Sequence, residues 1–288
     1  MNRTTAALPE RMSATTSEKK SWQDNRLDGN AIGVLGDIYG GLHVQGPPGN
    51  DQCLRDLWVT DPRADKIRIE REKDTLLKDC YVWILRSQQF QRWKTDDDSQ
   101  LLWIKGDPGK GKTMMMIGLV NELSGSGQAR LSSKNGSNTE TVASRRDLVS
   151  FFFCQSTRPE LNNAAAVLRG LIYLLVIQKK ELMQYVRKKY EAEGNKMFKG
   201  PDAIYALRGV LSEIADDPDL PRTLLLVDAL DECDTGLPEL LDIINNMQQG
   251  SKVKWLITSR NLPNIEEVLG SVPPAAQVNQ YDAERMRN

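Results

Sequence analysis

Residues 101–113, LLWIKGDPGKGKT, decide the fold. The first five residues form an apolar run of strand length that ends at a glycine, and the following MMMIGLVNEL, residues 114–123, has the pattern of a helix. The intervening residues 106–113 satisfy G-x-x-x-x-G-K-[ST] in the strand, loop and helix context that this pattern requires. The sequence therefore predicts a phosphate-binding loop.

The expected nucleotide-binding residues of this loop share one task, which is to surround phosphate oxygens with positive charge and N–H groups. They are Gly106, Asp107, Pro108, Gly109, Lys110, Gly111, Lys112 and Thr113. Lys112 is expected to reach the β and γ phosphates. The hydroxyl of Thr113 is expected to ligate Mg²⁺, which prefers hard oxygen ligands.

A second apolar run, residues 224–228 with the sequence LLLVD, ends in a carboxylate. Asp228 is therefore predicted to hold Mg²⁺ together with Thr113 at the carboxyl edge of a sheet. Asp231 and Glu232 follow closely enough to orient or polarise a water molecule near the γ phosphate. A role for this acid pair in capping the next helix stays open.

A third run, residues 254–258 with the sequence KWLIT, is followed by Ser259 and Arg260. The fixed fork of an arginine suits phosphate oxygens, so Arg260 is predicted to sense the γ phosphate. A guanine-reading N-K-x-D motif is missing, since NKMF at residues 195–198 lacks the aspartate. The base therefore stays open between adenine and guanine, with ATP as the default nucleotide over GTP.

Strand-like runs at residues 101–105, 149–154, 223–227 and 254–258 alternate with helical patterns at residues 163–178, 181–193 and 202–215. Strands that are apolar throughout are typical of a parallel sheet covered on both faces, and the alternation predicts an α/β fold. Residues 63–93 are expected to form one or two helices before the first strand. A loop rich in Gly, Ser, Asn and Arg is expected at residues 124–147.

The composition excludes several classes of protein. Lys and Arg number 38 against 39 for Asp and Glu, so no overall field favours a nucleic acid or an anionic membrane as partner. The longest apolar run, residues 171–177, is far shorter than the about 20 residues of a membrane-spanning helix. The polar N-terminus lacks the apolar core of a secretory signal, and we expect a soluble cytoplasmic protein.

The cysteines and the histidine exclude further chemistry. The four cysteines show no C-x-x-C spacing, and His43 is the one histidine. A zinc site, a disulfide framework and a histidine-dependent hydrolase centre are therefore not expected.

The motifs GDPGKGKT, LLLVDALDECD and WLITSR resemble the NACHT domains of signal-transducing STAND-class P-loop NTPases. Longer segments, among them FFFCQSTRPELNNAAAVLRGLIYLLV, resemble the fungal NOD-like receptor branch of the heterokaryon-incompatibility type, over roughly residues 53–270. The resemblance implies a P-loop NTPase fold of the AAA+/STAND kind, with a five-stranded parallel sheet and helices on both faces. It also implies a nucleotide-operated switch that controls oligomerisation.

On this basis we expect four regions. Residues 1–50 form a mobile tail, residues 51–98 a helical lead-in, residues 99–270 the NACHT domain, and residues 271–288 the start of a C-terminal helical region. Receptors of this family continue into a winged-helix domain, which supplies a nucleotide-sensing histidine, and into repeats. Since the sequence ends at Asn288 and its histidine precedes the loop, we expect a truncated chain, and a gene fragment and a short stand-alone NTPase both stay open.

Residues 29–49 hold seven of the 21 glycines, interleaved with apolar residues. In this family some N-terminal segments are amyloid motifs that template a downstream effector protein, and residues 29–46 occupy that position. Their apolar residues, with no proline and few acids, make cross-β stacking conceivable, while the many glycines favour a flexible linker.

The leading hypothesis is a Mg²⁺-dependent switch that binds ATP or GTP, hydrolyses it slowly and forms homo-oligomers on activation. The alternative is a nucleotide-independent scaffold whose N-terminal segment recruits a partner. A small-molecule kinase fits poorly, because no acceptor pocket is recognisable in the sequence.

Overall fold

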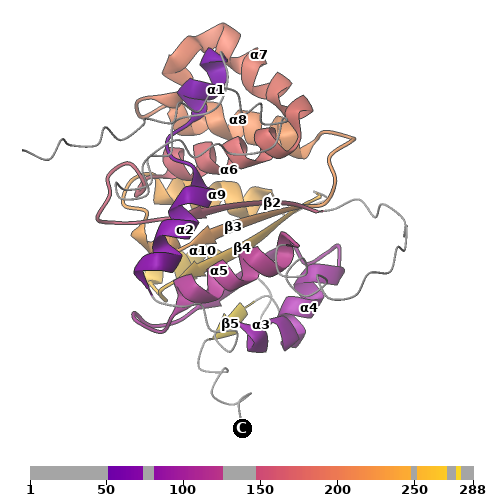
Figure 1. The fold of residues 1–288 in the computed structure, drawn as a ribbon, viewed down its shortest axis with the longest axis vertical. Coiled ribbons are helices and arrows are strands. Elements are labelled where there is room, and N and C mark those ends of the chain that lie inside the picture. The colour runs from indigo at the N-terminus through magenta and orange to yellow at the C-terminus, as the bar shows by residue number, and fades with distance from the viewer. Residues whose placement is uncertain (1–50, 74–80, 126–146, 248–251, 271–276, 280–288) are drawn as a thin grey trace, which may run out of the picture. The chain divides into compact units, whose positions relative to one another are not determined.

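A parallel sheet in the order β2-β3-β4-β1-β5 lies at the centre of the computed structural model (Figure 1). Its strands are β1 (Leu101–Lys105), β2 (Leu148–Phe153), β3 (Thr223–Asp228), β4 (Val253–Ser259) and β5 (Gln277–Asn279). The structure describes residues 51–73, 81–125, 147–247, 252–270 and 277–279, all of which belong to the unit 44–288. The predicted tail of residues 1–50, with its glycine-rich segment 29–49, lies outside them, as does most of the predicted loop 124–147.

The α/β class and the parallel sheet with helices on both faces are confirmed. Strands β1 to β4 have five to seven residues and form the body of the sheet, and their side chains are almost all buried. The fifth strand is much shorter, with three residues that pair with β1 at the edge. It lies in the stretch 271–288, where the start of a helical region was expected, and the other residues of that stretch are not described.

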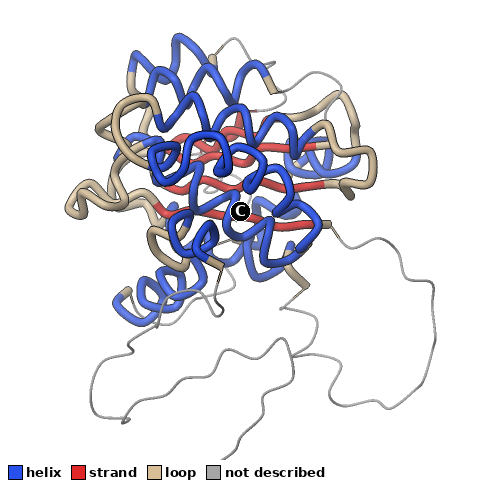
Figure 2. Tube along the Cα trace, turned by 90° about the horizontal axis from the view of Figure 1, so that it is seen from above, coloured by secondary structure: helices blue, strands red, loops and turns tan. Residues whose placement is uncertain are grey.

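The main helices follow the predicted alternation. Helix α5 (Lys112–Leu123) covers one face of the sheet, and α6 (Ala164–Gln178) covers the other with α8 (Ala203–Ala215) and α7 (Met183–Glu193) beyond it (Figure 1). Two further helices, α9 (Leu237–Asn246) and α10 (Pro263–Leu269), flank β4 in the chain. In the view from above in Figure 2, the strands form a layer with helices on both sides.

The described residues of the lead-in form four short helices. They are α1 (Gln52–Leu57), α2 (Pro62–Glu72), α3 (Val82–Arg86) and α4 (Gln88–Thr95). Three of them, α2 to α4, fall largely in the stretch 63–93, where one or two were expected. Asp51, Asp61 and Ser87 each cap the N-terminus of a helix with a side-chain oxygen, which divides the apolar pattern into separate helices.

These lead-in helices share one hydrophobic core with the sheet. Leu57, Ile84 and Trp93 are fully buried in the same cluster as the strands. The guanidinium of Arg169 on α6 donates hydrogen bonds to three carbonyl oxygens at the end of α1, those of Asp56, Leu57 and Trp58. The lead-in is therefore packed as part of the same domain as the sheet.

The described part of the chain contains no helix with the length and apolar character needed to cross a bilayer.

Candidate nucleotide site

The strand order brings three strand ends to one edge. Strand β4 lies between β1 and β3, with Lys105 opposite Ser259 and Val227 opposite Ile257. The residues that follow each strand therefore meet at the carboxyl edge of the sheet, where ligands bind in folds of this kind.

The phosphate-binding loop leaves β1 and is fixed to the neighbouring strand. The N–H of Gly106 donates to the carbonyl oxygen of Ser259 at 3.2 Å. Gly109 and Gly111 have φ of 74° and 79°, a left-handed backbone that other residues adopt with strain. Helix α5 begins directly after Gly111, so its first N–H groups point into the loop.

The ammonium of Lys112 folds back over this loop. It donates to the carbonyl oxygens of Gly106 at 2.6 Å and Asp107 at 2.8 Å. Burial lowers the pKa of Lys112, while the nearby Asp231 and Asp228 act in the opposite direction. A phosphate anion in this position would offset that burial cost by pairing with the charge.

Asp228 is the most deeply buried acid of the site, with 1% of its surface exposed. Its Oδ1 accepts a hydrogen bond of 2.6 Å from the hydroxyl of Thr258 on β4, and its carboxylate also pairs with the hydroxyl of Thr113. Burial raises the pKa of Asp228, and the hydrogen bonds from Thr258 and Thr113 partly offset that rise. A cation next to this carboxylate would stabilise its charged form.

The turn after Asp228 aims the next two acids at the cavity. Ala229 has φ 53° and ψ 50°, a left-handed conformation that no other described non-glycine residue adopts. Its N–H donates to the hydroxyl of Thr258 at 3.0 Å, and its carbonyl oxygen accepts from the N–H of Glu232 at 2.8 Å. A small side chain at this position limits the steric cost of the conformation.

Asp231 binds Arg260. Its Oδ1 accepts the backbone N–H of Arg260 at 2.9 Å, and its Oδ2 lies 3.0 Å from Nε of the guanidinium. The side chain of Asp231 is 4% exposed, whereas that of Arg260 is 49% exposed. In this structure Asp231 thus orients the arginine, and its expected task of orienting a water molecule stays a prediction.

Glu232 makes a different contact. Its Oε2 accepts the backbone N–H of Ser156 at 3.0 Å and lies 3.4 Å from the Ser156 hydroxyl, in the loop after β2. The carboxylate is partly exposed, and it lines the same cavity as the phosphate-binding loop. Both acids therefore line the cavity, with the carboxylate of Glu232 held by Ser156 and that of Asp231 paired with Arg260.

One cavity of about 170 Å³ joins these groups. Most of the predicted site residues line it: Pro108, Gly109, Lys110, Gly111, Lys112, Thr113, Asp228, Asp231, Glu232 and Arg260. Gly106 and Asp107 are not in the lining, but their carbonyl oxygens hold Lys112 at its base. Three further residues, Lys73, Met114 and Ala229, complete the wall.

The oxygen donors of the cavity fit Mg²⁺. Mg²⁺ is usually held by one or two carboxylates together with hydroxyl groups, water and the phosphates of a nucleotide, and Asp228 and Thr113 supply such a pair. Among the described residues no three His, Cys, Asp or Glu side chains cluster as a cage for a metal ion. The arrangement favours a metal that arrives with a phosphate ligand.

Sequence reasoning missed three residues of this site. Thr258 could have been found, because a hydroxyl near the carboxyl end of an otherwise apolar strand is an obvious partner for a neighbouring acid. Lys73 and Ser156 carry no such signal, since their position depends on how α2 and the loop after β2 pack.

Comparisons with known proteins agree with this geometry. Residues 79–260, more than half of the chain, match the family model described as Nephrocystin 3, N-terminal. The vegetative incompatibility protein HET-E-1 of Podospora anserina is 48% identical over 231 residues, which are 80% of this chain and 16% of that protein. The chain thus spans about one sixth of the length of this relative. The chain belongs to the family of the nephrocystin 3 N-terminal domain and contains a NACHT domain like that of HET-E-1.

Proposed function

We propose that this chain binds a nucleoside triphosphate with Mg²⁺ and acts as a slow, nucleotide-operated signalling switch. The observation that carries the proposal is the convergence of Lys112, Thr113, Asp228 and Arg260 on one cavity at the carboxyl edge of the sheet. These groups come from three different strand ends, and together they supply the charges that a bound triphosphate and its metal need.

Each group has a distinct task in the proposed complex. Lys112 leaves the carbonyl oxygens of Gly106 and Asp107 and pairs with phosphate oxygens. Asp228 and Thr113 would hold the Mg²⁺, which would supply positive charge to the terminal phosphates. Arg260, oriented by Asp231, contacts the end of the triphosphate.

Hydrolysis in this proposal depends on Glu232. Its carboxylate lines the cavity and is held by the backbone N–H of Ser156. A carboxylate in that position can accept a proton from an attacking water molecule. Because the loop after β2 holds Glu232, loss of the γ phosphate can be transmitted to that loop.

The similarity to a vegetative incompatibility protein supports a role in fungal non-self recognition or programmed cell death. We propose that exchange of the nucleotide releases one arrangement of the domain and permits homo-oligomer formation. ATP is the default nucleotide in this proposal, and GTP is the alternative.

The test measures the molar mass of the purified chain by light scattering with Mg²⁺ and either a non-hydrolysable ATP analogue, a GTP analogue, ADP or no nucleotide. The proposal expects nucleotide-dependent self-association in the parent that is lost in Lys112→Ala. The same mass in every condition, for a chain shown to bind nucleotide, would contradict the switch and favour a scaffold.

A further inference from the structure

The cavity contains a basic residue that belongs to none of the nucleotide-binding motifs. Lys73 follows directly after α2, and its backbone N–H donates to the carbonyl oxygen of Ile69 at 3.1 Å, so it ends the helix. Its exposed side chain lines the cavity together with Asp228 and Glu232. The lead-in helix thus reaches the site from a position about 40 residues ahead of Lys112 in the chain.

The lining of the cavity indicates which end of the nucleotide Lys73 faces. Lys73 shares that lining with Asp228 and Thr113, which are proposed to hold the metal, and with Glu232. The lining therefore places its ammonium near the proposed metal and the terminal phosphates.

The side-chain contacts of Lys73 differ from those of Lys112 and Arg260. Within the described residues, no hydrogen bond or ion pair of its side chain is found, whereas Arg260 is already paired with Asp231 and Lys112 with two carbonyl oxygens. A terminal phosphate in the cavity would provide Lys73 with an anionic partner.

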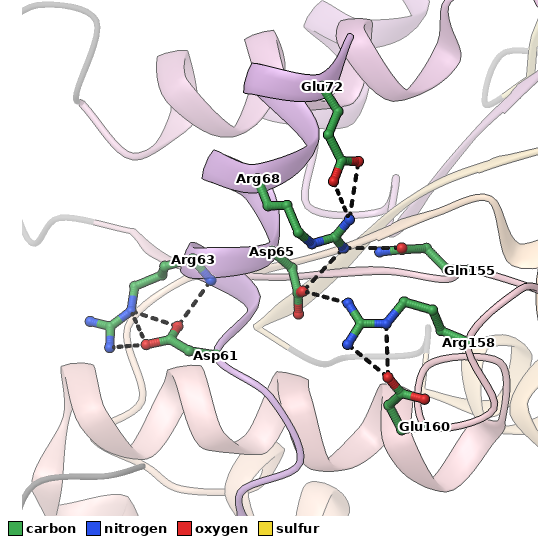
Figure 3. Close-up of polar contacts among 8 residues, drawn as sticks. All are labelled: Asp61, Arg63, Asp65, Arg68, Glu72, Gln155, Arg158 and Glu160. Atoms are coloured by element: carbon green, nitrogen blue, oxygen red, sulfur yellow. Dashed lines mark hydrogen bonds and ion pairs between the residues drawn. The ribbon is translucent and has the colours of Figure 1, made fainter. Parts of the chain in front are cut away.

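Helix α2 is clamped on two sides, which fixes the position of Lys73. On one side, Lys66 donates to the side-chain oxygen of Asn121 on α5 at 2.6 Å. On the other side, Arg68 lies at the centre of a network that reaches the loop after β2 (Figure 3). It donates to Glu72 at 3.2 Å, to Asp65 at 3.3 Å and to Gln155 at 3.0 Å.

The same network connects to the acid of the site. Asp65 also pairs with Arg158 at 3.5 Å (Figure 3), and Asp65 is largely buried. Ser156, which lies between Gln155 and Arg158 in the chain, holds Glu232 through its N–H. One loop therefore fixes both the carboxylate in the cavity and the helix that carries Lys73.

We infer that Lys73 is a nucleotide-specificity residue, which contacts the terminal phosphate of a bound triphosphate and so distinguishes a nucleoside triphosphate from a diphosphate. Arg68 is a positioning residue, because it holds α2 and does not touch the cavity. The inference rests on the proposed nucleotide binding and deepens it. It assigns the lead-in helix a direct part in reading the nucleotide.

The test compares Lys73→Ala with the parent in equilibrium binding of ADP and of a non-hydrolysable ATP analogue, both with Mg²⁺. We expect Lys73→Ala to weaken binding of the ATP analogue about 10-fold or more, the loss of one charge-assisted hydrogen bond, and to change ADP affinity less than about 2-fold. Lys73→Arg is expected to keep most of the preference. Arg71→Ala, on the same exposed turn but outside the cavity, is the matched control.

A purely structural role of Lys73 at the end of α2 would give a different result. It would change the melting temperature and leave the ratio of the two affinities unchanged, which would overturn the inference, as would an equal loss for both nucleotides. Arg68→Ala is expected to reduce the preference for the ATP analogue over ADP. In the Lys73→Ala background, Arg68→Ala is expected to reduce that preference no further. If the parent binds neither nucleotide, the proposed function fails as well, whereas binding of both with an unchanged ratio in Lys73→Ala rejects this inference alone.

Discussion

The hydroxyl of Thr258 donates a hydrogen bond of 2.6 Å to the buried carboxylate of Asp228. The hydroxyl oxygen of Thr258 also accepts a hydrogen bond of 3.0 Å from the N–H of Ala229, so one hydroxyl fixes both the acid and the left-handed turn that follows it. This contact exists because β4 lies next to β3 in the sheet. The proposed metal-binding end of the site is therefore built by two neighbouring strands.

Replacing Thr258 with valine tests this contact. Thr258→Val keeps the shape of the side chain but leaves the carboxylate and the N–H of Ala229 without this partner. We expect a loss of about 2–3 kcal/mol in the free energy of unfolding, measured by urea denaturation. Thr258→Ser, which retains the hydroxyl, is the control, and equal stability of the valine variant and the parent would contradict the prediction.

The raised pKa of Asp228 predicts that the stability of the chain depends on pH. Because burial raises the pKa of Asp228, ionising this acid costs the folded chain stability when no metal is bound. This contribution to stability is present below the unfolded pKa of about 4 and is lost as pH rises through the folded value. Asp228→Asn should therefore unfold at a higher temperature than the parent at pH 7 in EDTA, and the difference should shrink towards pH 4.

The control for this experiment is Mg²⁺ with nucleotide. The ligand should raise the melting temperature of the parent and have a much smaller effect on Asp228→Asn. An asparagine variant that is less stable than the parent at every pH would show that the charged carboxylate stabilises the chain even without metal.

Glycines in this fold predict three different outcomes for alanine substitution. At Gly111 an added Cβ meets no atom within 4 Å, so the cost is backbone strain at φ 79°, about 1–2 kcal/mol. At Gly118 on α5 the added Cβ overlaps the ring of Tyr81, and we expect a larger loss. At Gly209 on α8, which is exposed and open, alanine should stabilise by about 0.5–1 kcal/mol.

Denaturation of the three variants checks this ranking. Gly111→Ala should in addition weaken nucleotide binding, because the loop is strained at the helix start. A stability of Gly118→Ala equal to that of Gly209→Ala would contradict the packing of α5 on Tyr81.

Arg169 tests the attachment of the lead-in. Its partly buried guanidinium donates to three carbonyl oxygens at the end of α1, and desolvation lowers its pKa to about 10, so it stays charged at neutral pH. Arg169→Met should cost about 2–4 kcal/mol in unfolding free energy. Arg187→Met removes the exposed ion pair with Asp51 at the other end of α1 and should cost less than about 1 kcal/mol. Similar losses of unfolding free energy for the two variants would contradict a larger contribution of Arg169 to stability.

Glu232 predicts a separation of binding from hydrolysis. Glu232→Gln keeps the shape and a hydrogen bond to Ser156 but cannot accept a proton. We expect the rate of phosphate release to fall about 100-fold or more, with the affinity for the triphosphate changed little. Asp231→Asn, which weakens the pair with Arg260, should lower affinity as well. Unchanged phosphate release in Glu232→Gln would exclude it as the base.

Much of this fold could be predicted because the decisive signals are local. The phosphate-binding loop is one continuous motif, and β1 to β4 are apolar runs that only a doubly covered sheet can bury. The short strand β5 has no such signal, since its three residues form a strand through pairing with β1. Helix α10 is similarly short, with seven residues.

The tertiary parts of the site could not be predicted. Asp231 looks like a water-orienting acid in the sequence, but the register of β3 and β4 brings it to Arg260. Lys73 enters the cavity because Lys66 and Arg68 clamp α2 against α5 and the loop after β2. Neither contact follows from spacing along the chain.

The most direct test of the account is equilibrium binding of labelled ATP and GTP to the purified chain with Mg²⁺, measured beside Lys112→Ala. The account predicts micromolar or tighter binding of at least one nucleotide to the parent and a loss of about 10-fold or more in a folded Lys112→Ala variant. Binding of neither nucleotide to a folded parent, or equal binding to parent and variant, would contradict it.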